Sequence, residues 1–280
     1  MLEFELETAL TLADHASQKI LELYRTDLVA EEKLGVDNMY EPVTIADRIA
    51  SRMIVDGLRA AFPDDAILSE EDIDDKAGWV TNERAWIIDP IDGTAGYINQ
   101  DGDFAVQIGL AVGGKAMLGV VQLPFYGITH YAVAGSGAFI VNDGETTRLH
   151  TSSLNEFAEM KVAMTRNHYS RRMAQVLDHF GFKEMVRRGS VGLKIGLIAI
   201  RECDVYIHLS PRTKLWDSCA PEVIITEAGG RLTDVFGEPL DYHRSELSNL
   251  NGLVATNGAA HAAVIDHLRP LLDEYGRTRQ

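Results

Sequence analysis

The sequence predicts an α+β half followed by an α/β half, on three observations. Residues 104–141 contain short apolar strands joined by Gly-rich turns such as Gly113-Gly114, which is typical of hairpins in an antiparallel sheet. After about residue 150, strands and helices alternate, and this order favours a mixed or parallel sheet covered by helices. No internal repeat, low-complexity tract or flexible linker interrupts the chain. We therefore expect two closely packed domains, residues 1–152 and 153–280, with a cleft between them.

The N-terminal half begins with a predicted helix over about residues 2–25, because Leu, Ala and Ile recur there at helical spacing with charged residues between them. Residues 31–38 are charged, contain a glycine and show little periodicity. We expect an exposed loop or loose hairpin there, with Lys33 in solvent.

A second helix is predicted to start after Thr44, whose side chain suits an N-cap. Asp47 then falls in the first turn, where the helix dipole alone would explain a carboxylate. The short strand expected at 66–69 ends in the acidic run Glu70-Glu71-Asp72. Such a run is usually a solvated loop. Here a second acidic strand end follows 19 residues after Glu70, and the two ends could meet at one edge of a sheet.

That second strand end is the stretch Trp86–Asp92. Its apolar residues Trp86-Ile87-Ile88 predict a short buried strand. Pro90 is expected to stop the ladder and to hold Asp89 extended, so that Asp89 and Asp92 turn towards one point. On this pattern alone two interpretations stay open: a strand followed by an acidic turn, or a pair of hard oxygen ligands for a divalent cation.

The next residues add further groups to the same point. The Ile91 carbonyl is left free, and Gly93 permits a tight turn. Thr94 is expected to cap a helix whose first N–H groups face the carboxylates, and such N–H groups bind phosphate. The stretch therefore makes a place where a divalent cation and a phosphate can bind together.

The C-terminal half supplies a third carboxylate near a helix start. Pro221 fits only the first turn of a helix and Gly229-Gly230 its C-terminal stop, so we expect Asp217 at or just before the helix N-terminus. Taken alone, Asp217 is most simply an N-cap. The strands expected in this half lie near 161–165, 185–189, 203–209, 231–235 and 253–256, and the helices near 171–180, 191–200, 221–228 and 259–275.

Composition narrows the class of protein. A net charge of −16 argues against a nucleic-acid polymer or an anionic membrane as partner. Cys203 and Cys219 are the only cysteines, so no disulfide framework is expected. No signal peptide is visible at the N-terminus and no apolar run approaches membrane-spanning length. We expect a soluble cytoplasmic protein, for which the net charge does not exclude a small anionic substrate; a homodimer is an open alternative.

Three motifs together resemble those of the inositol monophosphatase superfamily, and their order and spacing match over nearly the whole chain. They are Ser69-Glu70-Glu71, Asp89-Pro90-Ile91-Asp92-Gly93-Thr94, and Trp216-Asp217 through Glu227-Ala228-Gly229-Gly230. The resemblance implies a metal-dependent, lithium-sensitive phosphatase with an αβαβα layered sandwich of the sugar-phosphatase type. This fold agrees with the antiparallel sheet that the hairpins predict in the N-terminal half and with the mixed sheet that we expect in the C-terminal half.

The resemblance also implies a metal site and a catalytic pair. Two or three Mg²⁺ would be bound by Glu70, Asp89, the Ile91 carbonyl, Asp92 and Asp217. Thr94 with Asp47 would orient and deprotonate the attacking water, Glu70 would serve in catalysis as well, and the loop bearing Lys33 would lie near a weaker metal position. This context replaces the dipole explanation for Asp47. Without cations, four carboxylates in one cleft would repel one another and raise one another's pKa.

Within the superfamily, the C-terminal half is most similar to the 3'(2'),5'-bisphosphate nucleotidases, in segments 165–168, 189–194 and 210–222. This similarity implies a substrate pocket formed by Gly93, Thr94, His168, Ser190, Lys194 and Arg212. Ser190, Lys194 or Arg212 would receive a 5'-phosphate and His168 would contact the nucleoside. The structural alternatives are that Lys194 snorkels from its helix and that His168 caps one.

One departure concerns the residues after Thr94. The nucleotidases usually have Lys-Glu-aromatic there, whereas this chain has Ala95-Gly96-Tyr97. The change affects contacts beside the scissile phosphate and leaves the metal ligands in place.

We therefore expect Mg²⁺-dependent hydrolysis of the 3'-phosphate of 3'-phosphoadenosine 5'-phosphate, by in-line attack of a metal-activated water. The first alternative is an inositol monophosphatase or another sugar phosphatase, for which Lys194 and Arg212 should be dispensable. The second is an idle regulator that binds phosphorylated ligands. The intact set of acidic residues with Thr94 argues against an idle site.

Overall fold

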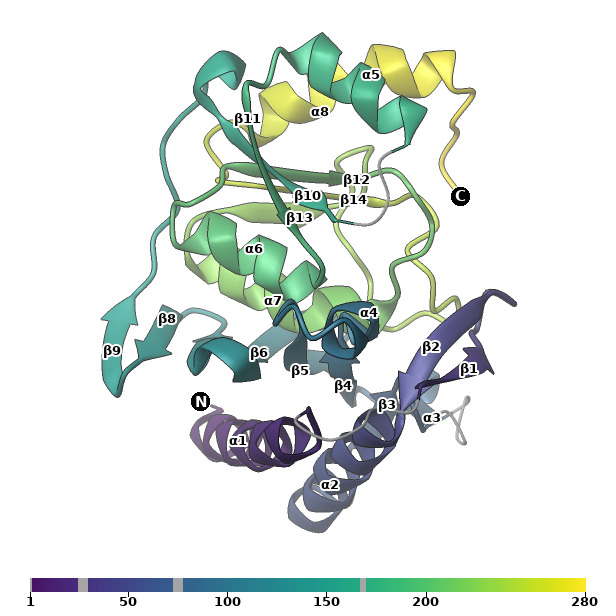
Figure 1. Cartoon of the computed structure of the whole chain (residues 1–280), viewed down its shortest axis with the longest axis vertical. Coiled ribbons are helices and arrows are strands. Elements are labelled where there is room, and N and C mark those ends of the chain that lie inside the picture. The colour runs from purple at the N-terminus through teal and green to yellow at the C-terminus, as the bar shows by residue number, and fades with distance from the viewer. Residues whose placement is uncertain (1, 25–29, 73–77, 167–169) are drawn as a thin grey trace.

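The computed structural model describes residues 2–24, 30–72, 78–166 and 170–280 and forms five layers (Figure 1). Helices α1 (Glu3–Tyr24) and α2 (Ile45–Ala61) cover the outer face of a seven-stranded sheet. Helices α6 (Val191–Ala199) and α7 (Leu215–Glu227) lie between this sheet and a five-stranded sheet. Helices α5 (Arg171–Phe180) and α8 (His261–Glu274) cover the far face. The predicted αβαβα sandwich is confirmed.

The seven-stranded sheet contains the predicted hairpins. Its strands follow chain order: β3 (Ala66–Ser69), β4 (Arg84–Asp92), β5 (Ala105–Val112), β6 (Lys115–Leu123), β7 (Ile128–Val133), β8 (Gly137–Asn142) and β9 (Glu145–Arg148). Only β3 and β4 pair in parallel, and every other neighbouring pair is antiparallel. The parallel pair brings the ends of β3 and β4, which carry Glu70 and Asp89, to the same edge.

The five-stranded sheet is mixed, as predicted. Its order is β11 (Glu184–Arg188), β10 (Lys161–Thr165), β12 (Val205–His208), β14 (Leu253–Thr256) and β13 (Arg231–Thr233). Strand β10 runs parallel to both neighbours, whereas β14 runs antiparallel to β12 and β13.

The shorter elements complete the chain. They are the antiparallel hairpin β1 (Ala30–Leu34) and β2 (Tyr40–Thr44), helices α3 (Gly78–Thr81) and α4 (Thr94–Ile98), and the 3₁₀ helices η1 (Pro124–Tyr126) and η2 (Phe157–Glu159). The hairpin agrees with the loose hairpin expected near 31–38.

The helices follow from their sequences. The buried residues of α1, among them Ala9, Ala13, Ala16 and Ile20, recur every three or four positions and form the stripe that faces the sheet. By contrast, α6 is apolar on all sides apart from Lys194 and is buried between the two sheets. Its core cluster joins residues from both sides of position 152. The division into domains at that position stays a prediction.

Two local predictions about proline are wrong, because a bulge in one case and helix packing in the other accommodate the residue. Strand β4 does not stop at Pro90 but continues to Asp92, with a bulge against β5 between Asp89 and Asp92 that accommodates the missing N–H. Helix α7 starts at Leu215, so Pro221 lies inside it rather than in its first turn. The rest of α7 packs against β5 and β6, which compensates for the single helical hydrogen bond that Pro221 removes.

Candidate metal centre and substrate cavity

A cavity of about 230 Å³ lies where the two halves of the chain meet. Its walls come from β2, the ends of β3 and β4, the start of α4 and the start of α7. The lining residues are Glu41, Pro42, Glu70, Asp89, Ile91, Asp92, Gly93, Thr94, Ala95, Arg212, Lys214, Trp216 and Asp217. The structure therefore brings together every predicted metal ligand.

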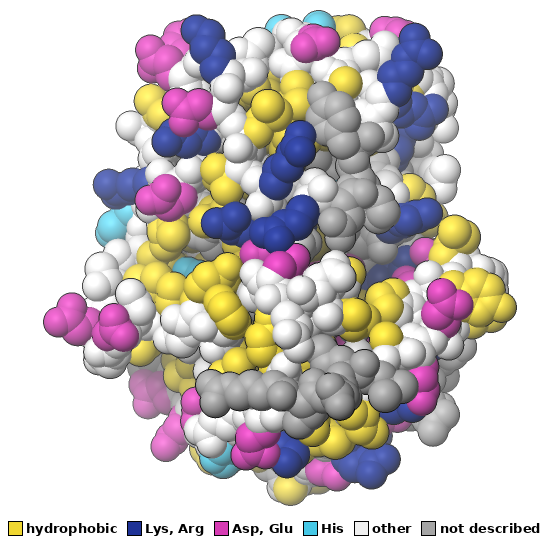
Figure 2. All heavy atoms as spheres, viewed as in Figure 1, with side chains coloured by type: hydrophobic (Ala, Val, Ile, Leu, Met, Phe, Trp, Pro, Cys, Tyr) yellow, Lys and Arg dark blue, Asp and Glu magenta, His cyan; other side chains and the backbone are white. Residues whose placement is uncertain are grey.

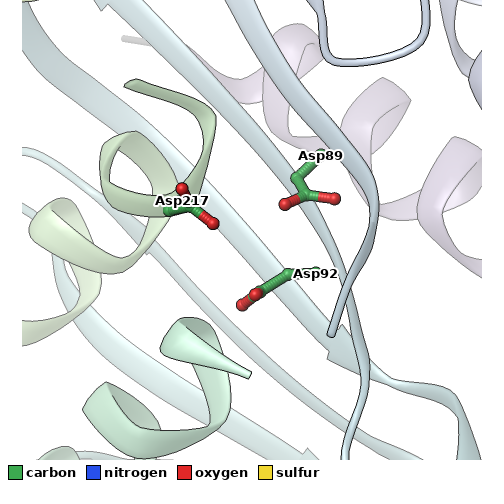
Figure 3. Close-up of side chains that lie close together, drawn as sticks. All are labelled: Asp89, Asp92 and Asp217. Atoms are coloured by element: carbon green, nitrogen blue, oxygen red, sulfur yellow. The ribbon is translucent and has the colours of Figure 1, made fainter. Parts of the chain in front are cut away.

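Asp89, Asp92 and Asp217 form the centre of this cavity (Figure 3). One carboxylate oxygen from each lies within 4.8 Å of the others. Asp89 and Asp92 flank the bulge at the end of β4, and Asp217 projects from the first turn of α7. Asp89 pairs with Gln107 and Asp92 with Ala105, so the bulge adds one residue to β4 relative to β5, and both aspartates reach the same cavity.

Hydrogen bonds from the protein hold each carboxylate in place. Asp92 Oδ2 accepts from Gln107 Nε2 (2.6 Å), Ser190 Oγ (2.5 Å) and the Gly192 N–H (2.8 Å). Asp89 Oδ1 accepts from the Ile91 N–H at 3.0 Å, and Asp217 accepts from the N–H of Lys214. These bonds restrict side-chain rotation and fix the geometry of the cluster.

The cluster is electrostatically unfavourable without a cation. Burial, followed by the charge of Glu70, raises the pKa of Asp89 well above its ordinary value. Burial and the charge of Asp92 do the same to the pKa of Asp217. Hard oxygen donors and excess negative charge are what Mg²⁺ and similar ions require. The residues present therefore fit a divalent cation.

Thr94, which lines this cavity, contacts Asp47, which does not line it. Thr94 Oγ1 lies 3.1 Å from Asp47 Oδ1 and 3.2 Å from the Ile91 carbonyl oxygen. Asp47 Oδ2 accepts from the N–H of Thr44 (2.8 Å), the reciprocal half of a capping box at the start of α2. Burial raises the pKa of Asp47. Such a carboxylate can accept a proton that passes through the Thr94 hydroxyl.

The cap of α4 differs from the prediction. Thr94 is the first residue of this helix, and Gly93 is its N-cap, with a φ of 98°. A Cβ on Gly93 would lie 2.5 Å from the Asp103 carbonyl oxygen. Glycine is therefore needed both for the left-handed backbone and for this close approach.

Lys33 is not solvated, contrary to prediction. Its Nζ donates to Glu70 Oε1 at 2.9 Å and also to Glu71, and only 20% of the side chain is exposed. Burial opposes its charge, but the two glutamates raise its pKa above the ordinary value. Glu71, buried beside Glu70, has a pKa of about 7. The β1–β2 hairpin is thus attached to the acidic strand end by attraction between opposite charges.

A second cavity of about 470 Å³ adjoins the first at Arg212, which lines both. Its other lining residues are Met164, Thr165, Ser170, Met173, Ile207, His208, Leu209 and Ser210, from the ends of β10 and β12 and the start of α5. His168 lies outside the described residues. The second cavity is predominantly apolar, as expected of a small-molecule pocket.

Ser190 and Lys194 are buried and line neither of these two cavities. Ser190 is fully buried and donates to Asp92. Lys194 is 1% exposed, donates to the Gly189 carbonyl oxygen at 2.8 Å and lies 5.1 Å from the centre of the Tyr206 ring. Burial lowers its pKa to about 8. Phosphate contact by either residue stays a prediction.

Sequence reasoning missed two further residues at the site. Gln107 is a polar residue inside an apolar strand, and this pattern was a usable signal of a buried polar contact. Lys214 is 2% exposed and pairs with Asp37 at 2.7 Å, 177 positions away in the chain. No local pattern marks such a contact.

Comparisons with known proteins agree with this geometry. A sequence profile of the inositol monophosphatase family matches residues 1–272. The chain is 31% identical over 245 residues to the 3'(2'),5'-bisphosphate nucleotidase CysQ of Aggregatibacter actinomycetemcomitans, covering 86% of this chain and 88% of that protein. It is 32% identical over 250 residues to the fructose-1,6-bisphosphatase/inositol-1-monophosphatase of Thermotoga maritima, covering 88% of each. The solved structure of Thermotoga maritima IMPase TM1415 aligns with a TM-score of 0.80 at 28% identity, over 96% of this chain and 98% of that one.

Proposed function

The chain belongs to the inositol monophosphatase family and is a metal-dependent phosphomonoesterase, and from this premise we propose that it is a 3'(2'),5'-bisphosphate nucleotidase. Its substrate would be 3'-phosphoadenosine 5'-phosphate, from which it would remove the 3'-phosphate. The observation that carries the proposal is the apolar cavity that meets the acidic cavity at Arg212. Similarity to a CysQ nucleotidase supports the same substrate class.

The acidic cavity is proposed to hold two or three Mg²⁺ through Glu70, Asp89, the Ile91 carbonyl, Asp92 and Asp217, with Li⁺ as an inhibitor. When bound, Mg²⁺ supplies positive charge that stabilises the transferring phosphate and makes a water molecule more acidic.

No helix within the described part of the chain has the length and apolarity to cross a bilayer.

The residues of the chain supply the proton path. Thr94 is placed to accept a hydrogen bond from the attacking water while its own hydroxyl donates to Asp47. As the water oxygen bonds to phosphorus and the bond from phosphorus to O3' breaks, the proton of the water passes through Thr94 to Asp47. The O3' atom leaves with the bonding electron pair and takes a proton from solvent water, and Asp47 later releases its proton to solvent. The backbone N–H groups at the start of α4, after Gly93, would bind the phosphate oxygens.

The substrate would extend across both cavities. With the 3'-phosphate at the carboxylate cluster, the adenine base would occupy the apolar cavity between Met164, Met173 and Ile207. Arg212 stands between these two positions and is exposed. Its guanidinium group can bind the 5'-phosphate through paired hydrogen bonds. A volume of about 470 Å³ is within the usual range for such ligand pockets.

The test is Mg²⁺-dependent phosphate release from 3'-phosphoadenosine 5'-phosphate and from inositol 1-phosphate at equal concentration. Asp89→Asn serves as the blank. Strong preference for the nucleotide supports the proposal. Preference for inositol 1-phosphate would leave the metal centre in place and reject the nucleotide pocket.

A second candidate function is inositol or sugar monophosphate hydrolysis, favoured by the similarity to the Thermotoga maritima inositol-1-monophosphatase. A monophosphate fits the 230 Å³ cavity without using the apolar one. It also needs no second anion contact, so Arg212 should then be dispensable.

A further inference from the structure

An ionic junction with a buried aspartate at its centre joins the loop between α4 and β5 to the ends of β10 and β11. In Figure 1 the end of β11 lies directly above α4, and in Figure 2 basic side chains cross the middle of the same face above acidic ones. The residues of the junction are Asp101 and Asp103 from the loop, and Arg166, Arg188 and Gly189 from the strand ends.

Asp103 is the centre of this junction. Its side chain is completely buried, yet it lines neither cavity. Its Oδ2 accepts from the Gly189 N–H at 2.9 Å and from Arg166 Nη2 at 2.6 Å, and its Oδ1 lies 3.8 Å from Arg188 Nε. The two arginines compensate the buried charge, while the bond to Gly189 fixes the backbone of the following turn.

The turn that Asp103 holds carries two of the three donors to Asp92. Ser190 directly follows Gly189, caps α6 through the Leu193 N–H (3.0 Å) and donates to Asp92 Oδ2. The Gly192 N–H donates to the same oxygen. A shift of the Gly189-Ser190 turn would therefore move both donors away from Asp92 together.

The main chain of Asp103 also packs against Gly93 and Gly96, which lie at the start of α4. Its carbonyl oxygen would lie 2.6 Å from a Cβ on Gly96, which explains why this chain has glycine there. The same oxygen approaches Gly93. Asp103 thus contacts the turn at Gly93, which follows Asp92, and also the Gly189-Ser190 turn, which donates hydrogen bonds to Asp92.

We propose that Asp103 is a positioning residue for the metal centre, which acts by fixing the Gly189-Ser190 turn and through it the orientation of the Asp92 carboxylate. It touches neither substrate nor metal. The inference rests on the proposed role of Asp92 as a metal ligand and is independent of which phosphomonoester is the substrate.

The experiment is calorimetric titration of the substrate-free protein with Mg²⁺, accompanied by thermal unfolding of each variant. Asp103→Ala should weaken Mg²⁺ binding about 10-fold, as is typical when a residue that orients a metal ligand is lost. Asp103→Asn keeps an acceptor for the Gly189 N–H and should weaken binding no more than about threefold. If the alanine variant does not fold, Asp103→Ser, which is too short to reach Gly189, provides the same comparison.

The matched control is Asp204→Asn. Asp204 is also a buried carboxylate that accepts from a backbone N–H, that of Lys161, but it stands at the far end of β12 from the apolar cavity. Its variant should bind Mg²⁺ as the wild type does, even where its melting temperature falls. An equal loss of affinity in Asp204→Asn and Asp103→Ala would overturn the proposal, because general destabilisation would then explain both.

A double-mutant cycle with Ser190→Ala tests whether Asp103 acts on Asp92 through the Gly189-Ser190 turn. If Asp103 acts through the turn, Asp103→Ala should add less than about twofold to the loss of affinity already caused by Ser190→Ala. Additive losses would overturn the proposal. Absence of Mg²⁺ binding by the wild type would reject the metal centre itself, and the inference with it. Wild-type binding that Asp103→Ala leaves unchanged would reject the inference alone.

Discussion

The two cavities that meet at Arg212 are built in opposite ways. In the acidic cavity, each aspartate is fixed by hydrogen bonds from neighbouring residues, and three donors converge on one oxygen of Asp92. The apolar cavity is lined by the ends of β10 and β12 and the start of α5, with Met164 and Met173 among its walls. Methionine side chains adapt to different shapes, whereas bonded carboxylates do not. On the proposed function, the reaction type would be set by a rigid region and the choice of substrate by an adaptable one.

The comparison is tested most strongly by Asp89→Asn in the rigid cavity. Loss of a charged ligand should reduce turnover about 1,000-fold or more, because several kcal/mol of transition-state stabilisation depend on the cation. Without metal the variant should be at least as stable as the wild type, because one of several buried like charges is gone. Phosphate release and thermal unfolding with and without Mg²⁺ measure both effects.

The stabilising effect of Mg²⁺ provides the control for that experiment. Mg²⁺ at about 100 times its dissociation constant should stabilise the wild type by about 2.7 kcal/mol and stabilise Asp89→Asn much less. Full turnover by the variant, or an equal shift of melting temperature in both proteins, would contradict the proposed metal centre.

Glu222, a carboxylate outside both cavities, can be compared with the aspartates of the acidic cavity. Glu222 lies on α7, as Asp217 does, and accepts from the Tyr242 hydroxyl at 2.5 Å. Burial raises the pKa of Glu222 to about 7, and the hydrogen bond opposes this only in part. Outside the metal centre, such a group takes up a proton instead of a cation.

Glu222 therefore makes stability depend on pH with a defined sign. Its pKa is raised on folding, so its contribution is fully present below the unfolded pKa and is lost as pH rises through about 7. Relative to Glu222→Gln, the wild type should lose about 2–3 kcal/mol of unfolding free energy between pH 5 and pH 8. Urea unfolding of both proteins across this range measures the difference. Parallel pH profiles would show that Glu222 is charged in the folded protein.

How much the sequence predicted depends on whether a contact is local. Asp89, Asp92 and Thr94 lie within six residues, so their convergence follows from one strand end, although the bulge at Pro90 was missed. Lys33 was placed in solvent because its partners, Glu70 and Glu71, are 37 and 38 positions away. The bond from Ser190 to Asp92 spans 98 positions and was missed for the same reason. The Lys33 contacts depend on how the β1–β2 hairpin folds back onto the end of β3, and the Ser190 contact depends on how α6 packs against the seven-stranded sheet.

Arg212 is the residue on which the two cavities can be compared directly, because it lines both. If the substrate is a nucleotide bisphosphate, Arg212→Ala removes a charge-assisted contact to the 5'-phosphate and should raise KM about 10-fold or more, with kcat changed little. For inositol 1-phosphate the same variant should change KM less than about twofold. Arg269→Ala, which removes an exposed cation on α8 that lines neither cavity, is the matched control. An equal rise of KM for both substrates would mean that Arg212 serves the acidic cavity alone. Arg212 would then not distinguish the two substrates, and the proposed division between a rigid reaction site and an adaptable recognition site would be wrong.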